Sequence, residues 1–440
     1  MKLENILSGL QDLKVRGTLE IEISKVENDS RKIKENDLFV AIKGFDANGH
    51  EHIEEAIENG AKAVLLQIDE TTKEMVQKIP SDVTIVLSSD TRNALAICAC
   101  NYYGNPSKKL KLVGVTGTKG KTTTTYMIRD ILEKQGIKVG LIGTVASYIG
   151  DKKIADNENT TPESLKLQEI LYKMEKEKCE VAVMEVSSQS LKLSRVAGCE
   201  FDMAVFTNLA EDHISSKEHP DMEDYFNSKL KLFKMCKLGI VNVDDIHGVM
   251  IPKLVPETKI KTYGIDNHCD LLAKDITVTN QCADFKVKIG EKNERVKVSI
   301  PGRFSVYNAL AAISVCVRLG CDAENIKEAL IDIRVPGRSE LVKNKKNLAI
   351  MIDYAHTPES LEKILSAVKI YTKGRVISVF GCGGDRDKNK RPMMGEASGR
   401  VADYTIITSD NPRSEDPEQI VKEIEEGIKK TKGKYECIVN

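Results

Sequence analysis

The residues best suited to chemistry form a glycine- and lysine-rich segment, Gly114-Val-Thr-Gly-Thr-Lys-Gly-Lys-Thr-Thr123. It follows LKLVGVTG, which predicts a buried strand, and it precedes KTTTTYMIRDILEKQG, which has helical periodicity. In that position, glycines let backbone N–H groups turn toward phosphate oxygens, and the helix N-terminus adds positive potential. Lys121 can reach the β- and γ-phosphates, and the Thr122 hydroxyl can bind Mg²⁺. The segment therefore predicts a site for ATP or GTP.

The match to the usual phosphate-loop pattern, G-x-x-x-x-G-K-T, is imperfect. Val115 stands where the first glycine is expected, and Gly114 is one residue early. A glycine-rich turn that binds no ligand is the alternative, but the run GKTTTT between a strand and a helix favours the nucleotide site. The residues assigned to that site are Gly117, Thr118, Lys119, Gly120, Lys121, Thr122 and Thr123.

Two further polar residues stand at the ends of apolar strands. Glu185 ends the run EVAVMEV, and His213 follows the run MAVFTN. Ligands of open α/β sheets bind outside the carboxyl ends of the strands, so both side chains can face a bound nucleotide. On position alone, a solvated strand-end carboxylate explains Glu185 equally well, and a lone histidine is more often structural than catalytic.

Composition narrows the class of protein. At 440 residues the chain has room for about three domains. Its 65 basic and 66 acidic residues nearly cancel, which gives no reason to expect a nucleic-acid or membrane partner. No apolar run approaches the roughly 20 residues that span a bilayer, and the start, MKLENILSGLQDL, lacks the order of a signal peptide. We therefore expect a cytoplasmic protein whose scattered cysteines are reduced and buried.

Two breaks in helical periodicity divide the chain into three predicted domains. The first is YYGNPSKK at 102–109, and the second is RVPGR at 334–338. The domains are expected at 1–108, 109–334 and 335–440. Apolar strands alternate with amphipathic helices in the second and third, which predicts an α/β class with mostly parallel sheets covered on both faces.

Further motifs fall in order along almost the whole chain and resemble the Mur ligases, most closely the MurE branch, which adds a diamino acid to a UDP-linked precursor. The motif GCGGDRDKxKRP together with DNPR separates this branch from its siblings and from folylpolyglutamate synthase. The matching segments are NDSRKIKENDLFVAIKG (28–44), NTTPES (159–164), MEVSSQ (184–189), FTNLAEDH (206–213), DMEDYFNSK (221–229), PGRFSVYNALAA (301–312), PGRSE (336–340), DYAHTPESLE (353–362), FGCGGDRDKNKRPMMG (380–395) and SDNPRSEDP (409–417).

The resemblance implies a fold and a reaction. The fold is the three-domain Mur ligase architecture, with a central phosphate-loop ATPase domain and a Rossmann-like C-terminal domain. The reaction forms an amide in two steps: a substrate carboxylate attacks the γ-phosphate of ATP, and the amine of an amino acid then displaces phosphate from the acyl phosphate. The implied substrates are UDP-N-acetylmuramoyl-L-Ala-D-Glu and meso-2,6-diaminopimelate, with ATP as co-substrate, Mg²⁺ as cofactor and a monomer as the active form.

The resemblance also implies roles for single residues. Lys121, Lys229, His213 and Glu185 are the catalytic set, and the metal set is Thr122, Glu185, His213 and Lys229 as its carbamate. Nucleotide contacts beyond the loop are Asn308, Arg338 and Asp353. The precursor contacts are Ser30, Thr160, Thr161, Ser187 and Arg195, and the amino-acid contacts are His356, Arg386, Asp410, Asn411, Pro412 and Arg413.

Simpler interpretations stand beside several of these roles. Ser30 can be a turn residue, Lys229 an exposed helical lysine, and His356 a cap on the turn before Pro358. The DNPR segment can cap the helix that begins near Pro417. Its arginine nevertheless suits the second carboxylate of diaminopimelate, which it can grip through two hydrogen bonds.

The chain also departs from the family pattern. Gln189 replaces a histidine, Leu193 a polar residue, Ser305 an asparagine and Ser339 a larger apolar residue, and the segment DHISSKEHP is longer than usual. A C-terminal GKGHE-type loop is not present, so weak ligation and a raised KM for the amino acid are expected. Two alternatives stay open: the same reaction with L-lysine or another diamino acid, and a protein that binds nucleotide and precursor without ligating them.

Overall fold

The structure is a computed structural model of the chain, and it describes all residues except 46, 213, 216, 217, 280, 343, 344, 347 and 440. Contacts divide it into two compact units. Unit 1 comprises Met1–Ala273, Lys288–Lys292 and Tyr307–Ala329, and unit 2 comprises Lys274–Val287, Asn293–Val306 and Leu330–Asn440.

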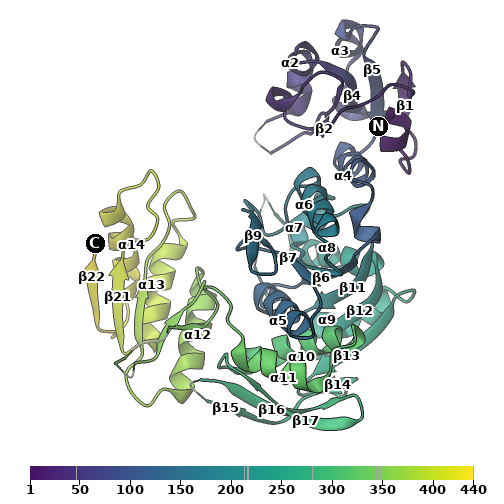
Figure 1. The fold of residues 1–440 in the computed structure, drawn as a ribbon. Coiled ribbons are helices and arrows are strands. Elements are labelled where there is room, and N and C mark those ends of the chain that lie inside the picture. The colour runs from purple at the N-terminus through teal and green to yellow at the C-terminus, as the bar shows by residue number, and fades with distance from the viewer. Residues whose placement is uncertain are drawn as a thin grey trace. The chain divides into compact units, whose positions relative to one another are not determined.

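Unit 1 begins with a five-stranded sheet in the order β1-β5-β4-β3-β2 (Figure 1). Only β1 runs antiparallel to its neighbour. Apolar side chains pack on both faces of the sheet, as expected for parallel strands covered on both sides. Its strands are β1 (Lys14–Arg16), β2 (Val26–Glu27), β3 (Asp37–Val40), β4 (Ala61–Gln67) and β5 (Thr84–Ser88), and its helices are α1 (Leu3–Ile6), α2 (Ile53–Glu58), α3 (Lys73–Lys78) and α4 (Thr91–Tyr102), with short 3₁₀ turns η1 (Ser30–Lys32), η2 (Gly49–His52) and η3 (Ile68–Glu70).

The larger sheet of unit 1 has nine strands in the order β14-β13-β12-β11-β6-β10-β7-β8-β9. All neighbouring strands pair in parallel except β7 with β8 and β8 with β9, which confirms the class predicted from strand–helix alternation. The strands are β6 (Lys111–Thr116), β7 (Val139–Ile142), β8 (Ser147–Ile149), β9 (Lys152–Ala155), β10 (Val181–Glu185), β11 (Phe201–Phe206), β12 (Cys236–Asn242), β13 (Lys259–Gly264) and β14 (Leu271–Leu272), and the helices are α5 (Lys121–Lys134), α6 (Ser164–Lys176), α7 (Ser188–Lys192), α8 (Met222–Lys234) and α9 (Ile246–Leu254), with the 3₁₀ turn η4 (Pro106–Lys108) before the sheet.

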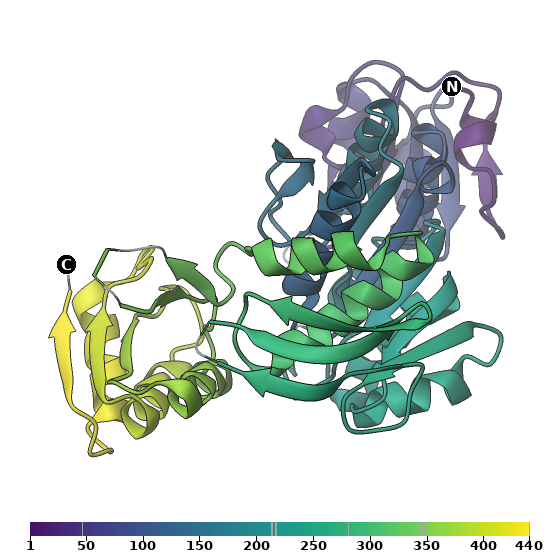
Figure 2. The same cartoon turned by 60° about the horizontal axis from the view of Figure 1, so that its bottom comes forward.

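A small antiparallel sheet was not anticipated. Its three strands, β15 (Lys274–Val278), β16 (Ala283–Ile289) and β17 (Lys292–Val298), lie side by side in Figure 2. Along β16, buried and exposed side chains alternate in ADFKVKI, which is the period of a half-buried strand. The same alternation is readable in the sequence, although the sequence-based expectation for this part of the chain was for strands alternating with helices. Helices α10 (Arg303–Arg318) and α11 (Ala323–Asp332) follow in the chain.

The C-terminal part of unit 2 contains a parallel sheet in the order β20-β21-β22. The segment KYECIVN forms β22, as predicted. The segment LAIMIDYAH forms β19, but this strand pairs with β18 in a separate antiparallel hairpin and does not continue the alternation expected for the domain. The elements are β18 (Glu340–Val342), β19 (Ile350–Ile352), β20 (Ile377–Phe380), β21 (Tyr404–Thr408), β22 (Tyr435–Ile438), α12 (Pro358–Tyr371), α13 (Lys390–Val401) and α14 (Pro417–Ile428).

Two side-chain features bear on the earlier expectations. Most cysteines are buried and all are free thiols, as predicted; Cys437 is the exposed one. Of the helices in the described part of the chain, none is both long and apolar enough to cross a membrane.

Helices α13 and α14 approach each other closely because glycines line their contact. A Cβ atom at Gly427 would lie 1.7 Å from the carbonyl oxygen of Pro392, and one at Gly395 would lie 2.1 Å from that of Ile424. The loops before these helices carry Arg386 and the DNPR segment, so the packing of the two helices sets the spacing of the predicted amino-acid pocket.

We expect Gly427→Ala to destabilise unit 2. In a helix interior, alanine is more favourable than glycine by about 1 kcal/mol. Overpacking costs roughly 1–3 kcal/mol, and the cost here should be near the upper end because the added Cβ overlaps backbone atoms. The midpoint of thermal unfolding should fall. Gly374→Ala is the matched control, since its Cβ would meet nothing within 4 Å. A raised midpoint for Gly427→Ala would show that the helices do not touch here.

Candidate active site

The phosphate loop joins β6 to α5 at the carboxyl edge of the nine-stranded sheet. Two of its glycines are required sterically. Gly117 has φ +144° and a Cβ there would lie 1.9 Å from Thr207 Oγ1; Gly120 has φ +87° and a Cβ there would lie 2.5 Å from Asn308 Oδ1. Other side chains would be strained at both positions. The contact with Gly120 also places Asn308, a predicted nucleotide residue, against the loop.

The end of β11 supports this loop from the other side. Thr207 Oγ1 donates to the Lys119 carbonyl at 2.7 Å, and Asn208 Oδ1 accepts from the Lys119 N–H at 3.0 Å. The Thr118 N–H donates to the Asn208 carbonyl at 2.9 Å. The loop conformation is therefore built into the fold.

Two lysines converge on one carbonyl of the loop. Lys121 Nζ donates to Gly117 O at 2.8 Å and to Thr118 O at 3.0 Å. Lys229 Nζ, from α8, donates to the same Gly117 oxygen at 3.0 Å. The structure thus brings Lys229 to the phosphate loop, as the resemblance implied.

Lys229 is not an exposed helical lysine. It is 1% exposed, and its ammonium lies 4.4 Å from the ring centroid of Tyr225. Burial, together with the positive charge of Lys121, holds the pKa of Lys229 well below its ordinary value. A lysine in this setting gives up its proton readily, and a neutral amine is the form that reacts with CO₂.

Glu185 ends β10 beside the phosphate loop. It is 1% exposed, so the interpretation as a solvated carboxylate is wrong. Its Oε2 accepts from Thr122 Oγ1 at 2.9 Å, and both of its oxygens accept from Thr144. Thr144 was not predicted from the sequence, although it stands two residues after the end of β7, where the same strand-end argument applies.

The hydroxyl of Thr122 and the carboxylate of Glu185 are hard oxygen donors, which fit Mg²⁺. Within the described residues, no cluster of three or more His, Cys, Asp or Glu side chains could hold a metal alone. Mg²⁺ commonly takes one or two protein oxygens and completes its shell with phosphate and water, so this small set suits it. His213, the other predicted ligand, lies outside the described residues.

Three predicted precursor residues come together just beyond Glu185. Thr161 Oγ1 donates to the Glu185 carbonyl at 2.9 Å and accepts from the Ser187 N–H at 3.0 Å. Arg195 Nη1 donates to the Thr161 carbonyl at 3.1 Å, and its other terminal nitrogen pairs with Glu163 at 2.6 Å. Thr160 reaches the same place through Thr144 Oγ1, at 3.1 Å.

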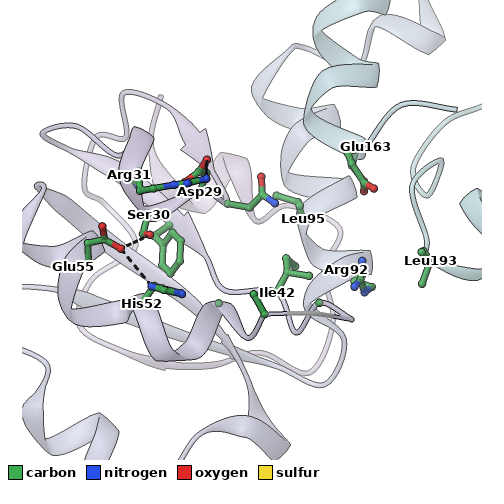
Figure 3. A pocket seen from close by; sticks show the side chains of 16 residues that line it. Asp29, Ser30, Arg31, Ile42, His52, Glu55, Arg92, Leu95, Glu163 and Leu193 are labelled. Atoms are coloured by element: carbon green, nitrogen blue, oxygen red, sulfur yellow. Dashed lines mark hydrogen bonds and ion pairs between the residues drawn. The ribbon is translucent and has the colours of Figure 1, made fainter. Parts of the chain in front are cut away.

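Ser30, the remaining precursor residue, lines a cavity of about 620 Å³ in unit 1 (Figure 3). Most of its wall comes from the part of the chain around the first sheet, and the rest includes Glu163 before α6 and Leu193 after α7. Ser30 is buried and lies in the 3₁₀ turn η1, so it is a turn residue as the simpler interpretation held, but the cap of that turn is Asp29. Arg92, His52 and Glu55 also line the cavity, and sequence analysis singled out none of them.

The other predicted nucleotide residues, Arg338 and Asp353, lie in unit 2. Asp353 Oδ2 accepts from the Ser339 N–H at 2.8 Å, and the Arg338 guanidinium lies 4.2 Å from the ring centroid of Tyr354. His356 Nδ1 lies 3.0 Å from the Tyr354 carbonyl oxygen. Thr357 caps helix α12, whereas His356 contacts the backbone just before the helix, which agrees with the simpler interpretation of this histidine.

Apart from His356, which precedes α12, the predicted amino-acid residues occupy two neighbouring loops of unit 2. Arg413 Nη1 donates to the Gly384 carbonyl at 2.5 Å, and the Gly384 N–H donates to the Asn411 carbonyl at 2.9 Å. Asp416 caps α14, so the DNPR segment at 410–413 does not perform that role. Arg386 and Arg413 are both exposed, and Arg413 has φ +49°, which is uncommon for a residue with a side chain.

A buried arginine holds these loops together. Arg391, at the start of α13, is fully buried and pairs with Glu415 at 2.8 Å and with Glu423 at 2.7 Å. Glu415 Oε1 also accepts from the Asp385 N–H at 2.6 Å. Arg391 belongs to the motif DRDKNKRP, but the sequence alone predicts no role for it.

Comparison with known proteins extends this account. Three family models match in succession: the Mur ligase family catalytic domain at 22–103, the Mur ligase middle domain at 115–316 and the Mur ligase glutamate ligase domain at 337–439. Two relatives are each named UDP-N-acetylmuramoyl-L-alanyl-D-glutamate--2,6-diaminopimelate ligase. The one from Clostridium botulinum is 48% identical over 93% of this chain and 84% of its own length. The one from Caldanaerobacter subterraneus is 48% identical over 100% of this chain and 89% of its own length.

Solved structures agree. A UDP-N-acetylmuramoyl-L-alanyl-D-glutamate--2,6-diaminopimelate ligase matches with a TM-score of 0.75 at 28% identity, over 100% of this chain and 88% of the other. A MurF ligase from Thermotoga maritima, in complex with ADP, matches with a TM-score of 0.60 at 23% identity, over 94% and 93%, which shows likeness of fold. With its three-domain α/β architecture and its phosphate loop, the chain belongs to the Mur ligase family.

Proposed function

We propose that the chain joins meso-2,6-diaminopimelate to UDP-N-acetylmuramoyl-L-Ala-D-Glu in peptidoglycan synthesis, through an acyl phosphate whose formation releases ADP and whose reaction with the amine releases phosphate. The names of the relatives support the reaction. The observation that carries it is the cluster at the edge of the nine-stranded sheet, where Lys121, Lys229 and Glu185 meet at the phosphate loop.

The cluster suits the first half-reaction. A carboxylate and a triphosphate repel each other, so catalysis needs cations held in advance at the point of attack. Lys121 supplies a fixed positive charge. Thr122 and Glu185 would hold Mg²⁺, and Lys229 as a carbamate would join them; bound there, the ion offsets negative charge between the two substrates. The peptide end of the precursor would be held next to Glu185, by Thr161, Ser187 and Arg195.

The second half-reaction needs an amino acid with its amine near the acyl phosphate. We assign its recognition to Arg413 and Arg386, because an arginine can bind the distal carboxylate of diaminopimelate through two hydrogen bonds. The bond from Arg413 to Gly384 fixes the direction of its guanidinium. The monomeric state, the cytoplasmic location, the domain boundaries and the roles of single residues stay predictions.

We expect Lys121→Ala to abolish ATP turnover, because the lost ammonium leaves the γ-phosphate charge without compensation. The measurement is phosphate release that depends on both UDP-muramoyl-dipeptide and a diamino acid. Lys134→Ala, at the far end of the same helix, should turn over normally. Unimpaired turnover by Lys121→Ala, with an unchanged melting curve, would contradict the phosphate-loop assignment.

We expect Lys229→Ala to lower turnover by at least about a hundredfold, in keeping with the loss of one preorganised charged group. Short carboxylic acids added to the assay should restore part of it, since they can replace the carbamate. In the unmodified protein, ¹³C-bicarbonate should give a carbamate resonance that Lys229→Ala lacks. Lys231→Ala, exposed on the same helix, is the control. A fully active Lys229→Ala variant would defeat the assignment.

We expect diaminopimelate to be preferred over L-lysine, and Arg413→Ala to narrow that preference. A lost arginine–carboxylate contact costs about 1.5–3 kcal/mol, which is roughly 10- to 100-fold in kcat/KM. The loss should fall on diaminopimelate, with lysine use little changed. Arg400→Ala, on the outer face of α13, provides the control. Preference for lysine by the unmodified protein would refute this interpretation of the DNPR segment.

A further inference from the structure

One wall of the cavity in Figure 3 carries a carboxylate that the proposed reaction does not use. Glu55 Oε2 accepts a hydrogen bond from Ser30 Oγ at 2.6 Å. His52 Nδ1 lies 3.4 Å from the same oxygen. Glu55 belongs to α2, whereas Ser30 belongs to η1. Asn59, just after α2, donates from Nδ2 to the Ser30 carbonyl at 3.0 Å, so the backbone of Ser30 is held as well.

The contact with Glu55 decides which way the Ser30 hydroxyl points. A serine hydroxyl has one proton to donate, and an ionised carboxylate can only accept. The proton of Ser30 is therefore directed at Glu55, and only the lone pairs of Oγ are left for a ligand. A phosphate or carboxylate oxygen would receive no hydrogen bond from Ser30 and would meet the negative charge of Glu55. An N–H or O–H group of the ligand could instead donate a hydrogen bond to the lone pairs of Ser30 Oγ.

Positive charge near Ser30 is offset locally. The Arg31 guanidinium makes two bonds to Asp29, at 2.9 and 3.0 Å. In Figure 3, Arg92 lies on the other side of the cavity from Glu55, beside Glu163 and Leu193. The cavity therefore has one end suited to a neutral donor group and another end with a cation at its wall.

We propose that Glu55 is a positioning residue that determines specificity at the Ser30 end of the cavity. By accepting the hydrogen bond of the Ser30 hydroxyl, it leaves Ser30 as an acceptor for a neutral donor of the ligand and disfavours an anionic group there. In a UDP-linked precursor, two donors fit: the imide N3–H of the uracil and a ribose hydroxyl. The inference rests on the proposed function, because it takes the precursor as the ligand.

Calorimetric titration of the full chain with UDP, N3-methyl-UDP and 2′-deoxy-UDP tests the proposal. The unmodified protein should bind one of the two analogues about three- to tenfold more weakly than UDP, which identifies the donor. The quantity compared between variants is the Kd of the weaker analogue divided by the Kd of UDP. In Glu55→Ala the Ser30 hydroxyl is free to rotate, so this ratio should fall toward its value in Ser30→Ala. Steric effects of the added methyl group act in all variants and cancel from the comparison of ratios.

Two variants guard against a merely structural effect. Glu55→Gln keeps an acceptor of the same shape and should keep most of the discrimination. Glu54→Ala removes a neighbouring carboxylate of α2 that pairs with Lys78, and it should leave the ratio unchanged. A ratio in Glu55→Ala equal to that of the unmodified protein would overturn the proposal, as would the absence of any UDP binding. Ligation measured on the same samples tests the proposed function separately. If the enzyme ligates and the ratio is unchanged in Glu55→Ala, only the role of Glu55 is refuted.

Discussion

The structure of the site depends on a buried lysine amine placed against the carbonyl of a phosphate loop. A buried ammonium is costly unless it is paired, and here a second ammonium, that of Lys121, shares its acceptor. The physical response is a lowered pKa at Lys229, which makes the amine neutral more easily. Reaction of the neutral amine with CO₂ would place an anionic carbamate beside Lys121, so the repulsion between two ammonium groups would give way to attraction.

The arrangement follows from sheet topology. Strand β6 lies between β10 and β11, and their aligned parallel ends deliver the phosphate loop, Glu185 and Thr207 to one edge. Helix α8 then brings Lys229 to the same place, with Tyr225 beneath its amine and the Tyr225 hydroxyl 3.1 Å from Thr118 Oγ1. Each group is held by regular structure, so little reorganisation is needed when charge develops during the reaction.

Sequence reasoning reached the parts that local patterns control. Strand–helix alternation predicted the parallel sheets, and the strand-end argument singled out Glu185, although only the family resemblance gave that residue a role. Sequence reasoning could not find Glu55, Arg92 or Arg391, because their contacts are with partners 24 or more residues away and depend on burial. Distant partners and burial of single side chains produce no periodic pattern in the sequence. Lys229 shows the limit most clearly: its helix predicts an amphipathic face, but only packing shows that its amine is buried. The β15–β17 sheet was missed for a different reason, since its alternation is visible once a strand is looked for.

The contacts of Lys121 have a consequence for nucleotide binding. Its ammonium donates to two carbonyls of the loop, at 2.8 and 3.0 Å, and these are the same kind of acceptor that phosphate oxygens offer. A triphosphate in the loop must compete with these carbonyls for the ammonium. The attraction between Lys121 and the phosphate is therefore reduced by the hydrogen bonds to the carbonyls that are lost. The net gain comes from the difference between a neutral carbonyl and an anionic oxygen, which grows as charge accumulates on the γ-phosphate. Lys121 would therefore contribute more in the transition state than in the bound ground state.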